Sequence, residues 1–145
     1  MRPLAENFPF FCIFAFLVCG ILCAALRSGR AAWLATVGVC AASALASAAL
    51  LKYTFAGNLS FTYTMGRFAA PFGNAVRAGP LQALLAAVFS LVAALSLIGG
   101  RRDLFHDVEP RRLPLYCTMV NMTVASLLTL TYTNDAFTGY VFIEI

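Results

Sequence analysis

The stretch from Phe8 to Leu26, FPFFCIFAFLVCGILCAAL, is the part of the sequence that decides the fold. Its nineteen residues carry no charged side chain. A helix needs about 20 predominantly apolar residues to cross the hydrocarbon core of a bilayer, and this run is close to that length. The apolar part of a secretory signal peptide is usually only about 7–15 residues long. We therefore interpret the stretch as a first membrane-spanning helix.

The composition extends this interpretation to the whole chain. Of the 145 residues, 61% are hydrophobic and only 11% are charged, and the mean hydropathy is +0.85. Soluble domains are usually about 45–50% apolar and about 25% charged. A soluble fold of this length could not bury so much apolar surface, so the composition predicts an all-α integral membrane protein. The net charge of +4 comes from basic residues spread over short loops, so we expect no nucleic-acid partner.

Three more apolar runs predict three more spanning helices. Together with the first helix, over 8–26, they cover residues 31–51, 79–99 and 113–131. The second run has eleven Ala or Ser residues in twenty-one positions, and small residues let membrane helices approach one another closely. We therefore expect this helix to pack among the others. Asn121 and neighbouring hydroxyl residues in the fourth run are expected to bond either across helices or to carbonyls of their own helix.

Residues 52–78, KYTFAGNLSFTYTMGRFAAPFGNAVRA, differ from the runs on either side. Aromatic and β-branched residues flank Gly57-Asn58, and this pattern predicts a short β-hairpin. The stretch is too polar and too broken to span, so we expect it to lie at or outside the lipid headgroups. Residues 100–112, GRRDLFHDVEPRR, are expected to form a charged loop on the opposite side, with His106 exposed to solvent.

The basic residues divide unevenly between alternate loops, and this gives an orientation. One side holds six arginines, at positions 27, 30, 101, 102, 111 and 112. The other side holds four basic residues, Arg2, Lys52, Arg67 and Arg77. Because cytoplasmic loops of membrane proteins carry the excess of Lys and Arg, we expect the N-terminus and the hairpin to lie outside a cell membrane that the chain crosses several times.

The last twelve residues, NDAFTGYVFIEI, predict a partial fifth helix over 135–145. Asp135 lies near the start of this helix, where the helix dipole favours a carboxylate. Glu144 follows nine residues later, about 13–14 Å further along the helix axis, which is close to half of a core about 30 Å thick. A charge at that depth costs about 2.5–3.5 kcal/mol and usually marks an ion path. The alternative is that the segment does not span and Glu144 is solvated.

The sequence shows no other arrangement that carries chemistry. There is no Ser-His-Asp set, no phosphate-binding loop and no C-x-x-C pair. Five cysteines fall within apolar runs, where a thiol usually acts as a small hydrophobic side chain; they are Cys12, Cys19, Cys23, Cys40 and Cys117. We expect no catalytic site, no metal site and no cofactor in this chain.

Two motifs resemble the antiporter-like proton-translocating subunits of Mrp-type sodium/proton antiporters, of the membrane arm of respiratory complex I and of hydrogenase-like membrane complexes. In the fifth-helix signature of that family, an acidic residue and a Phe two positions later precede an aromatic run ending in FxEI, as in Asp135, Phe137 and Glu144 here. The stretch MGRFAAPFGNAV is similar to the turn before the family's third helix. Its matching residues are Gly66, Phe68, Pro71, Phe72 and Gly73. The resemblance covers essentially this whole chain, but only about the first third of a full family member.

The resemblance implies a function in ion transport. In the family, the fifth-helix glutamate pairs with a lysine of a later helix and modulates the protonation of that lysine. Glu144 would take the glutamate's part in this proton relay as a buried carboxylate in the proton path, with Asp135, Phe137, Pro71 and Gly73 as the supporting motif. The one lysine of the sequence, Lys52, lies at a helix end, so the chain would be incomplete alone.

The partners implied are the lipid bilayer and other membrane subunits of an antiporter or respiratory-type complex, including a chain that carries the later helices. If that complex is related to NADH:quinone oxidoreductase, the chain belongs to an enzyme without holding its catalytic site. The alternative function is a small structural or assembly subunit without an ion path. In that case the small-residue faces of the 31–51 helix would form an assembly surface.

Overall fold

The computed structural model describes residues 7–57, 60–64, 75–134, 139–140 and 143–144, and it is mostly helical. Its helices and strands are, in chain order, α2 (Phe8–Ala25), α3 (Gly29–Gly57), β1 (Phe61–Thr64), β2 (Ala75–Ala78), α4 (Pro80–Gly99), α5 (Arg101–Asp107) and α6 (Leu113–Tyr132). Each of α2, α3, α4 and α6 is long and apolar enough to cross a membrane. The chain is therefore a multi-pass membrane protein.

Proline residues account for where three of these helices start, and lipid accounts for their apolar outward faces. α2, α4 and α6 each have a proline in the first helical turn, where the missing backbone N–H leaves no bond unmade. Within the apolar windows of the four long helices, only 28% to 39% of the residues are buried inside the chain. The outward faces carry exposed Leu, Ile, Val and Phe side chains. Such helices are apolar on all sides because lipid or neighbouring subunits cover the faces that the bundle does not bury.

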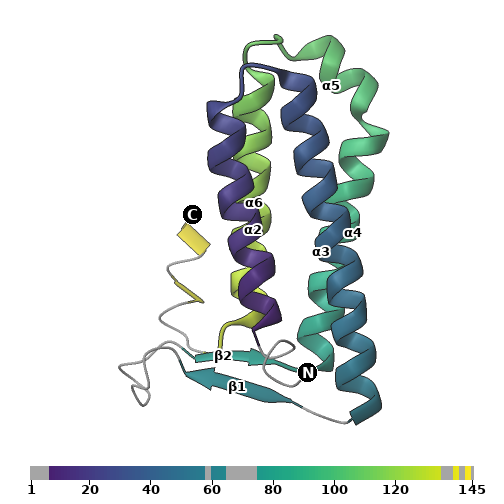
Figure 1. Cartoon of the computed structure of the whole chain (residues 1–145), viewed down its shortest axis with the longest axis vertical. Helices are drawn as coiled ribbons and strands as arrows, with labels where there is room; N and C mark the ends of the chain where they lie inside the picture. Colours follow the sequence, from purple (N-terminus) through teal and green to yellow (C-terminus); the bar gives the residue numbers. More distant parts are fainter. Residues whose placement is uncertain (1–6, 58–59, 65–74, 135–138, 141–142, 145) are drawn as a thin grey trace.

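The four long helices form two packed pairs, α2 with α6 and α3 with α4 (Figure 1). α3 and α6 also touch across the bundle, so α2 and α4 occupy diagonal corners. The α4 face that is buried consists mostly of small residues, namely Ala83, Ala86, Ser90, Ala94 and the larger Leu97. Small buried residues of α3, such as Ala32 and Ser43, match it. The predicted close packing of the 31–51 helix is confirmed.

α3 is longer than the predicted helix, and this changes the region that follows it. Residues 52–57 continue the helix, so a hairpin turn at Gly57-Asn58 is wrong. An extending helix satisfies its own backbone groups near the membrane, and buried Thr54 adds a bond from its hydroxyl to the Leu50 carbonyl at 2.9 Å. The strand preference of the aromatic and β-branched residues in this stretch is weaker than the stabilisation from these helical hydrogen bonds. Two four-residue strands pair later, antiparallel, with Phe61 opposite Ala78.

The predicted charged loop 100–112 contains a helix, α5, over Arg101–Asp107. Leu104 and Phe105 of α5 are partly buried and pack against the core, which ties the short helix to the end of the bundle. Val108, one turn after Leu104, is also partly buried. Three apolar residues therefore hold this charged stretch against the bundle as a helix. His106 is exposed, as expected, but it lies on a helix.

Candidate functional site

Glu144, the predicted proton-relay residue, lies in the helical fragment at the C-terminal end of the described chain. Its side chain is exposed on the surface of this chain, and it accepts a hydrogen bond at 3.3 Å from the hydroxyl of Tyr140, four residues earlier in the sequence. In Figure 1, where the long axis is vertical, this yellow end of the chain stands at a level about half-way along α2 and α6. Glu144 is therefore not buried by the described residues of this chain, and the prediction of a buried glutamate finds no support here.

The supporting motif residues cannot be placed in the same way. Asp135, Phe137, Pro71 and Gly73 lie outside the described residues, as do Gly66, Phe68 and Phe72 of the second motif. Their part in a site stays a prediction.

A cation partner for Glu144 is not found in the part of the chain that the structure describes. The two ion pairs there are His106 with Asp107 and Arg112 with Glu109. Lys52 is exposed near the end of α3 that lies towards the strands. A basic partner for Glu144 would have to come from residues other than those described.

Inside the bundle, the structure assembles a polar node that joins three helices. Asn121 of α6 is fully buried, and its Nδ2 donates to the Thr36 hydroxyl of α3 at 2.9 Å and to the Cys117 carbonyl at 2.8 Å. The Thr36 hydroxyl donates in turn to the Ala32 carbonyl at 2.9 Å. Cys23 of α2 completes the node, with its Sγ 3.6 Å from the Thr36 hydroxyl and 3.8 Å from Asn121 Nδ2. Asn121 thus bonds both across helices and within its own helix.

A second polar contact lies further along the bundle. The hydroxyls of Ser43 on α3 and Ser90 on α4 are 3.0 Å apart, and both residues are buried. Beyond them, Ser47 lies near Tyr132, the last residue of α6. Three buried polar atoms in the described chain, Ser47 Oγ, Asn121 Oδ1 and the Tyr132 hydroxyl, make no hydrogen bond of their own.

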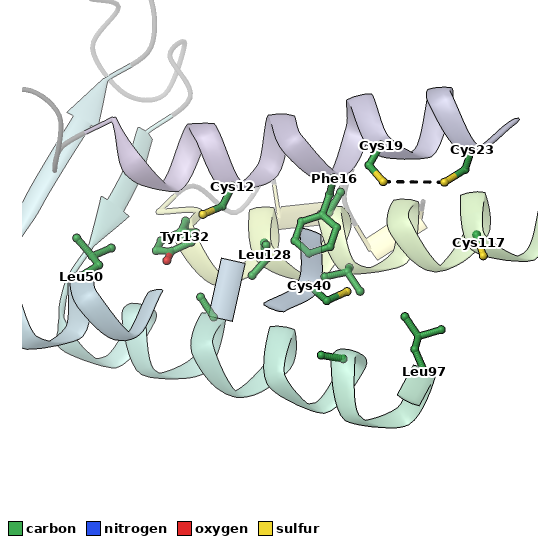
Figure 2. Close-up of a cluster of buried hydrophobic side chains, with 14 of the residues drawn as sticks. Cys12, Phe16, Cys19, Cys23, Cys40, Leu50, Leu97, Cys117, Leu128 and Tyr132 are labelled. Carbon is green, nitrogen blue, oxygen red and sulfur yellow. Dashed lines mark hydrogen bonds between the residues drawn. The ribbon is translucent and has the colours of Figure 1, made fainter. Parts of the chain in front are cut away.

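The cysteines lie along the same interior. All five are buried and free, and Figure 2 shows Cys12, Cys19 and Cys23 along the side of α2 that faces the other helices. The Cys19 and Cys23 sulfurs are 3.9 Å apart, one helical turn along α2. Among the described residues, no three His, Cys, Asp or Glu side chains gather closely enough to hold a metal ion.

This interior can make hydrogen bonds but holds no charge. Across the described ranges, the buried side chains with polar groups are Ser, Thr and Asn together with Trp33, Tyr132 and the cysteines, and none is a carboxylate or an amine. These neutral groups join neighbouring helices by hydrogen bonds.

The row of buried polar residues along α3 was not predicted, although the sequence contains a signal for it. Small polar residues recur along α3 at spacings of three, four or seven, which place them on one face of the helix. They are Thr36, Cys40, Ser43, Ser47 and Thr54.

Comparisons with known proteins place the fold. No protein-family model matches the sequence, and no curated protein matches it. A chain in the structure of the Mrp complex from Dietzia sp. DQ12-45-1b is similar over 97% of this chain and 25% of its own length, with 20% identity and a TM-score of 0.77. A chain in the structure of the membrane-bound sulfane sulfur reductase, an archaeal respiratory membrane complex, is similar over 98% of this chain and 27% of its own length, with 18% identity and a TM-score of 0.74.

The chain therefore spans about a quarter of the length of each chain that it matches. At these identities the similarity establishes the fold. The described chain has the fold of one portion of a membrane subunit from each of these two multisubunit complexes.

Proposed function

We propose that the chain forms the N-terminal part of a membrane subunit that translocates protons, or exchanges sodium for protons, in an Mrp antiporter or an NADH dehydrogenase-like complex. The observation that carries this proposal is the fold similarity, which takes in 97% of the chain for a subunit of an Mrp complex and 98% for a subunit of a respiratory membrane complex. The two sequence motifs resemble the same class of subunit, although they involve only a few residues.

The position of Glu144 supports a path along the outside of this bundle. The described interior holds neutral polar groups only, whereas Glu144 is exposed on the surface of the chain. A carboxylate at mid-membrane level needs a partner or a water-filled cavity, because lipid alone would make its charge costly. The face that carries Glu144 therefore packs against another part of the complex. A lysine there would form the pair that the family resemblance implies.

The partners and the orientation follow from the same proposal. The matched chains are about four times as long as this one, so the later helices of the subunit, including the one with the lysine, cover the exposed apolar faces of α2, α4 and α6. The arginine-rich end of the bundle faces the cytoplasm of the cell. β1 and β2 lie on the outer side, as the positive-inside rule requires.

Substitution of Glu144 tests the relay. In the complex reconstituted into proteoliposomes, Glu144→Gln should lower proton or sodium/proton flux by at least about tenfold, because a positioned proton-transfer group contributes about a hundredfold or more. Glu109→Gln is the matched control, because Glu109 is exposed and paired with Arg112 at the far end of the bundle. The control should keep normal flux.

One observation favours a second function, a structural or assembly subunit. Among the described residues, Glu144 accepts a hydrogen bond from Tyr140 and has no cation partner. This is the surrounding expected of a carboxylate that takes no part in transport. This second function requires that Glu144→Gln and Glu144→Ala assemble and transport normally. Normal flux in both variants would remove Glu144 from the ion path and leave assembly as the function of the chain.

A further inference from the structure

A basic pocket of about 580 Å³ lies where the start of α3 meets the end of α4 and α5. Its lining combines charged and apolar side chains, namely Arg30, Ile98, Gly99, Arg101, Arg102, Phe105 and His106. No acidic residue is among these lining residues. The pocket therefore presents three guanidinium groups at one end of a set of membrane-spanning helices.

The three arginines are not committed to carboxylates. Of the ion pairs among the described residues, one joins Arg112 to Glu109 and the other joins His106 to Asp107. Neither uses a pocket arginine, and Asp107 is already engaged by His106. Arg30, Arg101 and Arg102 are all exposed, so their positive charge is available to an anion from outside the chain.

Trp33 does not line the pocket itself, but it contacts two residues that do, Phe105 and Arg101. The indole N–H of Trp33 donates to the Leu97 carbonyl at 3.0 Å, which ties α3 to α4. The Phe105 ring packs edge-on against Trp33, with the ring centroids 6.1 Å apart. The Arg101 guanidinium lies 5.0 Å above the Trp33 ring, a cation–π contact that holds this arginine in place. This side of the pocket is thus organised before any ligand binds.

An apolar surface continues from the pocket towards the middle of the bundle. Ile98 lines the pocket and is 52% exposed, and Leu34, one turn after Arg30, is 62% exposed. Leu91 and Leu95 are also exposed, and their spacing from Ile98 puts them on the same face of α4. A ligand that fits this whole surface has an anionic head and long apolar tails.

We infer that this pocket binds the headgroup of an anionic phospholipid. The phosphate accepts hydrogen bonds from the arginine forks, which match a phosphate better than a lysine would. The acyl chains lie along Leu34 and Ile98. Basic pockets between membrane helices bind lipid headgroups in this way. The inference needs only a membrane-embedded chain and does not depend on ion transport.

Lipid retention by the purified chain of 145 residues tests the inference. In native mass spectrometry from a mild detergent, phosphatidylglycerol should bind at least about tenfold more tightly than phosphatidylcholine with the same acyl chains, since each arginine near a headgroup contributes about a fivefold preference. The double variant Arg30→Ala/Arg102→Ala should lose about 25-fold in phosphatidylglycerol affinity, about fivefold for each arginine removed. Arg111→Ala is the matched control. It removes an exposed arginine from the same end of the bundle without touching the pocket, and should bind normally.

Several outcomes would overturn the inference. Equal binding of the two lipids, or normal phosphatidylglycerol binding by the double variant, would rule out the pocket as a headgroup site. Displacement of the lipid by inorganic phosphate in molar excess would assign the pocket to a soluble anion instead. If the alanine variant does not fold, as judged by circular dichroism, Arg30→Lys/Arg102→Lys replaces it. That variant keeps the charge, loses the fork and should bind with intermediate affinity.

Discussion

Asn121 is the one buried residue with a side-chain amide among those that the structure describes. It is a fully buried amide between apolar helices, and it offers two donors and an acceptor to an interior with little else to bond. Both donors are used, one towards Thr36 on α3 and one towards the Cys117 carbonyl. Because an unpaired amide would be costly at this place, the pairing fixes how α6 is turned relative to α3.

Replacing this amide should cost measurable stability. Asn121→Leu removes the bond between α6 and α3, and interhelical hydrogen bonds in membranes contribute about 0.6 kcal/mol on average and up to about 1.7 kcal/mol. We expect the free energy of unfolding in mixed micelles to fall by about 1–2 kcal/mol, which includes the misfit of the leucine side chain. Thr123→Val is the control, because the hydroxyl of exposed Thr123 donates to the Met119 carbonyl of its own helix rather than across helices. Equal losses in the two variants would refute the cross-helix account.

At the scale of elements, the start of α3 lies in close contact with the start of α6. A Cβ atom on Gly29 would lie 2.7 Å from the Cβ and 2.8 Å from the Cδ1 of Leu113. Leu113 is only 2% exposed, so it has little room to move away. The two helix ends can meet only because the first residue of α3 has no side chain.

A pair of glycine substitutions on α3 tests this contact. Gly29→Ala should destabilise the fold by about 1–3 kcal/mol, the usual cost of overpacking a filled site. Gly38→Ala changes the same helix at a place where a Cβ meets no atom of the described residues within 4 Å. It should be neutral or stabilise by up to about 1 kcal/mol, because alanine suits a helix interior better than glycine. Thermal unfolding of both variants in one detergent gives the comparison. A stable Gly29→Ala variant would show that the two helix ends can move apart to accommodate a methyl group.

At the scale of the whole molecule, the bundle has two unlike ends. The described arginines of the α2–α3 turn, of α5 and of the start of α6 gather at the upper end in Figure 1. Lys52 and Arg77 are the described basic residues towards the lower end, where β1 and β2 lie. The charge difference counted along the sequence thus coincides with the two ends of the bundle, and it favours one orientation in the membrane.

Labelling of single introduced cysteines tests the orientation. The native thiols are buried and should react little. A membrane-impermeant maleimide applied to intact cells should label Thr62→Cys, on β1, and should label Asp107→Cys, on α5, only after the membrane is made permeable. Both positions are exposed, so each serves as the other's control. The reverse pattern would place the arginine-rich end outside and contradict the positive-inside prediction.

The sequence by itself determined the membrane class and the four spans. Lipid demands about 20 apolar residues in a row, and this requirement can be counted along the chain without knowing what packs against what. The small residues of 31–51 were informative for the same reason, since close approach needs small side chains wherever the neighbour lies. The helix end at Gly57 and the helix α5 were missed, because both depend on packing at the ends of the bundle rather than on local preference.

Only the tertiary structure decided which polar residues meet. Asn121 bonds to Thr36 although 85 positions separate them, and Arg30 shares a pocket with Arg101 and Arg102 from the far half of the chain. No local pattern encodes such a pairing, because it depends on which helices are neighbours and on how each is turned. Burying small faces against one another fixed that choice and left Glu144 on the outside, where the proposed path would meet the rest of the complex.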